Sequence, residues 1–310
     1  MKIFKSALAI LMALLMVFSL AACGEKEPAV DDDGNTGKVE SFKETTIELD
    51  ECTIVVLGAE EITDYDEKPA IRVWFDVTNT SDETCYTNYN YEFTATQDGY
   101  ELTETGAAYD ISVEAADVGL LKIRPGVTIR ACEEYSFKKD GGTIIVGFNN
   151  YYSEEEPKTV EFDPANLPGA PAEEFAREKV ADPQWVADLP ADGTYESYGV
   201  KYDLKIAKHE FTEGYEGEKL IRVYYEFTNN SDDEQTFSMN CTHAAYQDGI
   251  ELPISYAKES VAEDDKSYED VKPGDTVTLS YCYELSGDSP IEIEARDIHD
   301  GGVGAVFEVE

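Results

Sequence analysis

Basic residues are scarce in this sequence. It has 24 lysines and arginines against 66 aspartates and glutamates, and its formal charge is −42. Nucleic-acid binding needs a basic surface to meet the phosphate backbone, and no cluster of lysine or arginine is present, so this function is excluded. Adhesion to anionic lipid or anionic wall polymer is disfavoured because the like charges repel. The acidity favours solubility and self-repulsion, and a cationic ligand or basic protein partner is the alternative use.

Signatures of catalysis, cofactors and metals are equally scarce. The histidines His209, His243 and His299 have no metal-ligand spacing, and no G-x-S-x-G nucleophile motif adjoins them. There is no C-x-x-C and no glycine-rich phosphate loop. With 66 acidic residues, carboxylate pairs arise by chance and identify no glycosidase site. We therefore predict no enzyme activity and no catalytic, cofactor-binding or metal-ligating residue.

Calcium is considered separately because the acidic triplet Asp31-Asp32-Asp33 invites it. A calcium loop starting at Asp31 needs glycine at its sixth position and glutamate at its twelfth, but Thr36 and Phe42 stand there. This motif is therefore rejected. Calcium held by acidic loops between two domains stays open.

The cysteine count gives little support to a disulfide framework. Apart from Cys23, the chain has five cysteines, and an odd number leaves at least one unpaired within a chain. They are Cys52, Cys85, Cys132, Cys241 and Cys282. Cys241 with Cys282 is the one candidate pair in the second half of the chain, and whether it forms stays open because buried cysteine is often only a small apolar residue.

The first 23 residues are typical of an exported, lipid-anchored bacterial protein. Lys2 and Lys5 precede an apolar run that is short for a membrane span and ends in Leu-Ala-Ala-Cys. This ending resembles the lipobox of bacterial lipoproteins, which implies cleavage after residue 22, lipidation of Cys23 and attachment to the extracytoplasmic face of the cell membrane. Two acyl chains at about 0.8 kcal/mol per buried CH₂ hold such a protein durably. Residues 23–44 are polar and are predicted to be a disordered tether.

One stretch of the chain occurs twice. Residues 71–102 and 221–252 align at an offset of 150 positions, and 14 of the 32 residues are identical. Apolar and polar residues alternate in both copies, as in a half-buried strand, and Asp98-Gly99 and Asp248-Gly249 signal hairpin turns. Six or seven short strands in about 115 residues predict an antiparallel β-sandwich for each repeat. The chain is thus all-β, with repeat 1 over residues 45–163 and repeat 2 over residues 195–310.

Residues 164–194 form a proline-rich linker between the repeats, and we expect one short helix near Ala172–Val180. Trp185 is expected to pack this helix against a neighbouring domain. Two further features are candidates for binding. The run from Tyr86 to Tyr91 has the Tyr/Asn/Thr composition of binding loops, although its tyrosines also suit the core face of a strand. Trp74 and Tyr224 lie opposite the apolar stripe and serve either as exposed platforms or as packing under a loop.

The shared motifs resemble a known family. A strand ending in Thr-Asn-x-Ser-Asp, then Gln-Asp-Gly at a hairpin, then Lys/Arg-Pro-Gly before a strand is similar to an uncharacterised immunoglobulin-like family of Gram-positive lipoproteins, a domain of unknown function. The resemblance covers both repeats and implies two tandem immunoglobulin-like domains. Neither repeat has the Cys…Trp…Cys order of antibody domains, so their inter-sheet disulfide is not expected.

These observations together predict a non-catalytic binding, adhesion or scaffold module of the bacterial cell envelope, anchored to the membrane through Cys23. The alternative is a lipoprotein that captures a substrate or cation for a transporter or envelope enzyme. Transport-linked proteins of that kind usually show alternating βα units, which this sequence lacks.

Overall fold

The computed structural model describes residues 42–89, 91–108, 113–116, 118–264, 266–298 and 301–309. Its central strands follow the alternation seen in the sequence. In β3 (Pro69–Asn79), the side chains of Ile71, Val73, Phe75 and Val77 are fully buried. Their neighbours along the strand point to the opposite face, as the two-residue period of an extended chain requires.

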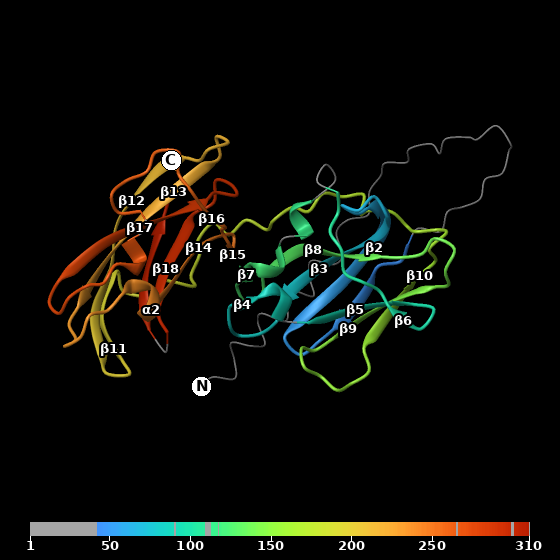
Figure 1. Cartoon of the computed structure of the whole chain (residues 1–310), viewed down its shortest axis with the longest axis horizontal. Helices are drawn as coiled ribbons and strands as arrows, with labels where there is room; N and C mark the ends of the chain where they lie inside the picture. Colours follow the sequence, from blue (N-terminus) through green and yellow to red (C-terminus); the bar gives the residue numbers. More distant parts are fainter. Residues whose placement is uncertain are drawn as a thin grey trace. The chain divides into compact units, whose positions relative to one another are not determined.

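Repeat 1 consists of two antiparallel four-stranded sheets (Figure 1). The first has the order β1-β2-β3-β8, and the second has the order β10-β9-β5-β6. Besides β3, the strands are β1 (Thr45–Glu48), β2 (Cys52–Thr63), β5 (Glu92–Gln97), β6 (Tyr100–Glu101), β8 (Thr128–Ser136), β9 (Ile144–Asn149) and β10 (Lys158–Phe162). Shorter elements are β4 (Cys85–Tyr86), β7 (Lys122–Ile123) and the 3₁₀ turns η1 (Thr87–Tyr89), η3 (Glu114–Ala116) and η4 (Val118–Leu120).

Repeat 2 keeps this strand order and adds β16 at the edge of its first sheet. One sheet has the order β11-β12-β13-β17-β16, and the other has the order β19-β18-β14-β15. Strand β15 also pairs with β7 of repeat 1, and β7 pairs with β4. The strands are β11 (Asp192–Ser197), β12 (Val200–Glu213), β13 (Lys219–Asn229), β14 (Cys241–Gln247), β15 (Ile250–Glu251), β16 (Ile254–Ser255), β17 (Thr276–Glu284), β18 (Ile291–Asp297) and β19 (Gly302–Phe307). The helical elements are α2 (Phe237–Asn240) and the 3₁₀ turn η5 (Lys266–Tyr268). The predicted all-β class, built from antiparallel sandwiches, is confirmed.

Even the irregularities of the two repeats coincide. The pairing of β2 with β3 shifts between Val56 and Gly58, and the pairing of β12 with β13 shifts between Ile206 and Lys208. These bulges lie 150 residues apart, the same offset as the sequence repeat. A bulge inserts one extra residue into a strand and increases its local twist. The two halves therefore share one backbone design down to a single-residue insertion.

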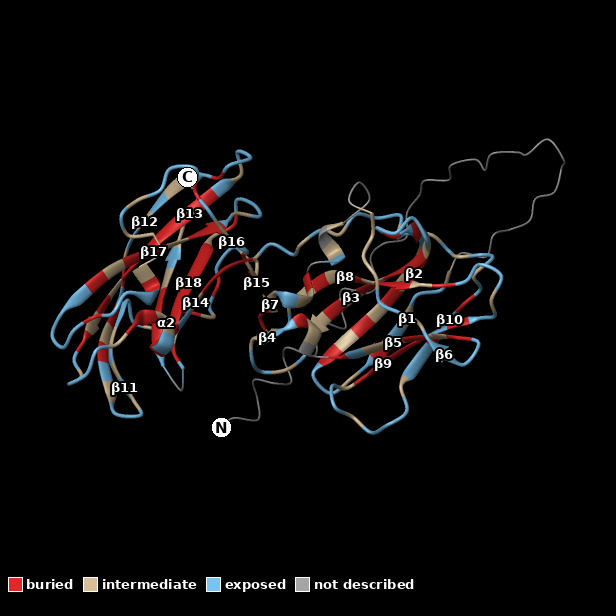
Figure 2. Cartoon of the chain, in the orientation of Figure 1, coloured by how far each residue is buried: buried red, intermediate tan, exposed pale blue. Residues whose placement is uncertain are grey.

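Each repeat buries its core between its two sheets (Figure 2). In repeat 1 the ring of Phe75, from one sheet, meets that of Phe148, from the other, edge to face at 5.3 Å between centroids. In repeat 2 the corresponding strand contributes Tyr225, whose hydroxyl lies 3.0 Å from that of Tyr283. A buried hydroxyl costs free energy unless it is hydrogen-bonded, and this pair satisfies both groups.

Three local expectations differ from the structure. The segment 172–180 is described throughout and contains no helix, because an isolated helix of about nine residues is marginal and the linker bonds to repeat 1 through Glu173 O instead. The strand expected from Tyr89 begins only at Glu92, since Thr87–Tyr89 closes a 3₁₀ turn. Strand β11 begins at Asp192, inside the range expected for the linker.

Candidate functional site

A buried arginine sits on the outer face of the first sheet of repeat 1. Arg72 is only 3% exposed although it points away from the core. Its Nε donates to Glu134 Oε1 at 2.6 Å, and its Nη1 lies 3.4 Å from Glu60 Oε1. Trp74 Nε1 donates to the same Glu60 oxygen at 3.0 Å. A buried guanidinium requires such paired carboxylates, so these four side chains form a rigid polar layer on the sheet.

Repeat 2 reproduces this layer at the equivalent positions. Arg222 donates through Nη1 to Glu210 Oε1 at 2.8 Å, and the hydroxyl of Tyr224 donates to the same oxygen at 2.8 Å. The hydrogen bonds from Arg222 and then Tyr224 hold the pKa of Glu210 below its usual value. Trp74 and Tyr224 thus both pack over the outer face and donate to a glutamate there. They are packing residues, as in the second of the two interpretations, and do not stand out as exposed platforms.

The linker crosses the outer face of repeat 1. Gly169 N donates to Ala59 O at 2.8 Å, which adds a single bridge to strand β2 at its bulge. This close approach is possible because residue 58 is glycine: a Cβ there would stand 2.6 Å from Gly169 O. The equivalent residue in repeat 2 is Lys208, whose Nζ lies 3.9 Å from the centre of the Tyr224 ring. The second outer face is therefore covered by its own side chain instead of a linker.

Arg130 fastens the next part of the linker. Its guanidinium binds both carboxylate oxygens of Asp76, at 2.8 and 3.1 Å, and its Nη1 donates to Glu173 O at 2.7 Å. The ring of Phe175 lies 5.4 Å from the guanidinium carbon. Bidentate pairing fixes the plane of an arginine, so Arg130 offers the linker a rigid donor and a flat stacking surface.

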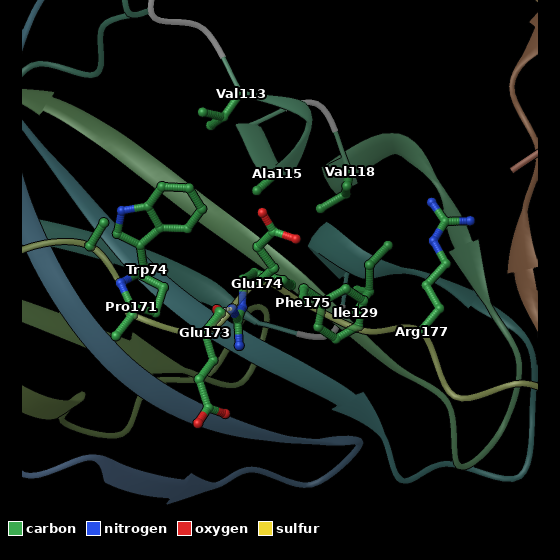
Figure 3. Close-up of a pocket in the computed structure, with 13 residues that line it drawn as sticks. Trp74, Val113, Ala115, Val118, Ile129, Pro171, Glu173, Glu174, Phe175 and Arg177 are labelled. Atoms are coloured by element: carbon green, nitrogen blue, oxygen red, sulfur yellow. Dashed lines mark hydrogen bonds between the residues drawn. The ribbon is translucent and has the colours of Figure 1, made fainter. Parts of the chain in front are cut away.

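These contacts leave a groove of about 360 Å³ between the linker and the 3₁₀ turns η3 and η4 (Figure 3). We call it the Trp74 groove. Its walls are mostly apolar and are formed by Trp74, Val113, Ala115, Val118, Ile129, Ala170, Pro171, Ala172 and Phe175, with Arg130, Glu173, Glu174 and Arg177 as the polar members. Figure 3 shows Glu174 projecting towards Ala115, whereas Glu173 projects the opposite way. A small apolar or aromatic group fits such a space, since pockets of about this volume bind small molecules mainly by apolar contact.

Arg130 and Phe175 are not among the site residues expected from sequence. A signal for them does exist in the comparison of the repeats: β-sheet register places Thr278 where repeat 1 has Arg130, and Lys208 where it has Gly58. A residue that differs between the two repeats is not required by the fold that they share. In repeat 1, both Gly58 and Arg130 contact the linker.

The other expected binding cluster is divided by the fold. Tyr86 is 37% exposed with Lys122 Nζ 5.0 Å from its ring centre, whereas Tyr91 is buried in the core at 4% exposure. Asn90 lies outside the described residues. The core alternative is therefore right for Tyr91, and the run from Tyr86 to Tyr91 does not present one tyrosine surface.

The histidines and cysteines pack in separate places. His209 stacks on Phe307 at 3.9 Å, His243 stacks on Tyr281 at 3.6 Å, and His299 lies outside the described residues. Cys241 and Cys282 are free thiols: Cys241 belongs to the core, whereas Cys282 packs with Leu220 and Ala257 in a separate cluster. A disulfide needs Cβ atoms about 4 Å apart, so the candidate pair is not formed here.

The described part of the chain contains no group of three or more His, Cys, Asp or Glu side chains that could hold a metal ion. None of its helices is long and apolar enough to cross a membrane. Cys23 and the triplet from Asp31 to Asp33 lie outside the described residues, so lipidation of Cys23 stays a prediction.

Two solved structures are similar to part of this chain. A protein of Staphylococcus aureus subsp. aureus NCTC 8325, provisionally described as a lipoprotein, is 19% identical, covers 38% of this chain and 92% of its own length, and has a TM-score of 0.29. A protein of Enterococcus faecalis solved by NMR is 15% identical, covers 40% of this chain and 96% of its own length, and also has a TM-score of 0.29. No curated protein matches the sequence.

A family model matches the chain twice. It covers residues 27–150 and 196–297, which together make up most of the sequence and fall one on each repeat. This double match agrees with the shared strand order and the shared bulges. The chain therefore belongs to DUF5067, a family of domains of unknown function.

Proposed function

We propose that this protein is a non-catalytic binding module, anchored by a lipid on Cys23 to the extracytoplasmic face of a bacterial cell membrane, and that its two immunoglobulin-like domains present a ligand-binding surface. The Trp74 groove is the observation that carries the proposal. Its walls are mostly apolar, and Arg130 is already engaged by Asp76 and Glu173 O. Such a groove supplies contact area and shape in place of a poised acid, base or nucleophile.

Anchoring is supported by the sequence of the first 23 residues. The test compares wild-type protein with Cys23→Ala in intact bacteria supplied with a labelled fatty acid. We expect wild-type protein to carry the label and to partition into detergent, and Cys23→Ala to do neither. Cys85→Ala is the matched control and should behave as wild type. Labelling of Cys23→Ala, or a mature wild-type protein that starts elsewhere and carries no lipid, contradicts the proposal.

Ligand binding in the groove is tested with Trp74 as a reporter. The chain has two tryptophans, so full-length protein carrying Trp185→Phe keeps Trp74 alone. The probe is the neutral dye N-phenyl-1-naphthylamine, which fluoresces in apolar surroundings. We expect the dye to quench Trp74 by energy transfer and to bind saturably.

Neighbouring alanines provide the blocking variant and its control. Ala115 lines the groove, so Ala115→Phe should fill it and abolish the transfer. Ala116 is exposed and does not line it, so Ala116→Phe should bind dye as before. Equal dye binding by both variants would mean that the groove is not the site.

A further inference from the structure

A second groove lies in repeat 2 and is lined by exposed tyrosines. Its volume is about 420 Å³. Tyr215, Tyr256 and Tyr268 are 73%, 73% and 80% exposed, and Ile254 beside them is 54% exposed. The tyrosines come from three places: the turn after β12, the chain after β16, and η5. We call this the tyrosine groove. A concentration of exposed aromatic rings in one concave surface is uncommon on a soluble domain and marks an interaction site.

The base of the tyrosine groove is held in place by hydrogen bonds. Asp264 accepts from Ser280 Oγ at 2.5 Å and from Val261 N at 2.9 Å. Arg222, the buried arginine of the outer face, donates through Nη2 to Glu259 O at 2.5 Å. The loop between β16 and η5 is thus fastened to the sheet at both ends. A pre-organised wall lowers the entropy lost on binding.

The repeated architecture shows that the ring of Tyr256 is not needed by the fold. The bridge between Gly214 and Ala257 corresponds to the bridge between Asp64 and Ala107 in repeat 1. Tyr256 therefore stands where repeat 1 has Gly106. A glycine serves the same backbone, so the ring at Tyr256 has another use. Aromatic side chains offer large, rigid contact areas at low entropic cost, which is why binding surfaces use them.

The charge around the tyrosine groove specifies the kind of partner. The turn at residues 213–218 carries Glu213, Glu216 and Glu218 and is followed by Lys219. The opposite loop carries exposed Glu259 beside exposed Lys258, and η5 carries Lys266. Acidic residues outnumber basic ones around the groove. The whole chain carries a charge of −42. Anionic partners are repelled, whereas an arginine can stack its guanidinium on tyrosine faces and pair with the surrounding carboxylates. We propose that the tyrosine groove binds an arginine-rich segment of a protein partner.

The test uses the full-length protein in detergent and a fluorescent peptide of alternating arginine and glycine. Anisotropy is measured at about 150 mM salt, where unspecific attraction between exposed charges is largely screened. We expect saturable binding that weakens roughly tenfold in each of Tyr215→Ser and Tyr256→Ser, with unchanged melting temperatures because both rings are exposed. Glu213→Gln should weaken binding less and reduce its salt dependence.

Matched controls separate the tyrosine groove from general acidity and from the Trp74 groove. Tyr65 is the repeat 1 counterpart of Tyr215 and is 69% exposed. The substitution Tyr65→Ser should therefore leave peptide binding unchanged. A glutamate-glycine peptide should not bind. Equal binding by wild type, Tyr215→Ser and Tyr256→Ser overturns the proposal, as does tyrosine-dependent binding of a neutral oligosaccharide with no binding of the arginine peptide. Ala115→Phe, which blocks the Trp74 groove, should not affect the peptide, so the two proposals can fail separately.

Discussion

At the scale of single residues, the clearest duplicated device is a buried asparagine at the end of the central strand. Asn79 and Asn229 are fully buried. The side-chain amide of Asn229 donates to Asp233 O at 2.7 Å and to Val271 O at 2.8 Å, and its oxygen accepts from Ser231 N at 2.9 Å. Asn79 makes the same three kinds of bond. The Thr-Asn-x-Ser-Asp motif therefore ties a turn to a distant strand.

Replacing Asn229 by alanine removes three hydrogen bonds, of which the one to Val271 O is buried and the other two are partly buried. We expect Asn229→Ala to lower the free energy of unfolding by about 2–4 kcal/mol, measured by urea denaturation. Asn230→Ala is the control, because that side chain is exposed, and it should change stability by less than about 0.5 kcal/mol. Equal effects of the two substitutions would mean that the buried amide does not hold the turn.

Glu133 is a residue whose place only the fold reveals. It is paired opposite Val73 in the β3–β8 ladder and so faces the core side of the sheet. Burial, followed by repulsion from Glu104 and Glu134, raises its pKa to about 7. In the unfolded chain the pKa is near its ordinary value of 4.5. Between these values the folded protein keeps a proton that the unfolded chain has released, so this group makes stability fall as pH rises from about 4.5 to about 7.

Glu133→Gln should remove that loss. We expect the free energy of unfolding of the variant to equal that of wild type near pH 4 and to exceed it by about 2–3 kcal/mol at pH 8. Urea denaturation at both pH values measures it. His243 contributes the opposite slope, because burial lowers its pKa to about 4, but it does so in both proteins and cancels in the difference. Glu161→Gln, at an exposed position, should follow wild type throughout. A Glu133→Gln curve parallel to wild type would contradict the assignment.

At the scale of elements, the linker shows how tertiary contacts override local preference. Residues 172–180 have the composition of a short helix, yet the chain forms no helix there. The carbonyl of Glu173 accepts from Arg130, whereas in a helix starting at Ala172 this carbonyl would be bonded within the helix. The irregular linker forms one wall of the Trp74 groove.

Gly58→Ala tests this dependence. Its Cβ would stand 2.6 Å from Gly169 O, a backbone atom, so the linker must move off strand β2. We expect faster proteolysis within the linker and a red shift of Trp74 emission in the Trp185→Phe background, with little change in the stability of repeat 2. Gly287→Ala, where a Cβ meets nothing, is the control. Unchanged proteolysis in Gly58→Ala would show that the linker is not held at this bulge.

At the scale of the whole molecule, the charge of −42 acts on stability and association. Most of the acidic side chains that the structure describes are exposed, and they repel one another through water. The same charge supports the proposed preference of the tyrosine groove for arginine, since it raises the local concentration of cationic partners.

Salt should therefore stabilise the protein. We expect the melting temperature to rise when sodium chloride is increased from about 10 to about 200 mM, because the Debye length falls from about 30 Å to below 10 Å. Potassium chloride should act equally. Calcium at matched ionic strength is the informative comparison: a clearly larger rise with calcium would indicate a specific site of the kind left open for the acidic loops, and no rise with any salt would mean that repulsion is unimportant.

The sequence by itself determined the β class, the repeat and the alternation of core strands, because these depend on periodicity and turn chemistry that are local to each segment. Ile71 and Phe75, for example, could be placed in the core from spacing alone. The tertiary structure alone decided what covers the opposite face. Arg72 and Trp74 are spaced like exposed residues, yet Arg72 is buried, and its guanidinium is bonded to Glu134 and Glu60. A period of two says which way a side chain points, but the neighbours that meet it come from residues far along the chain.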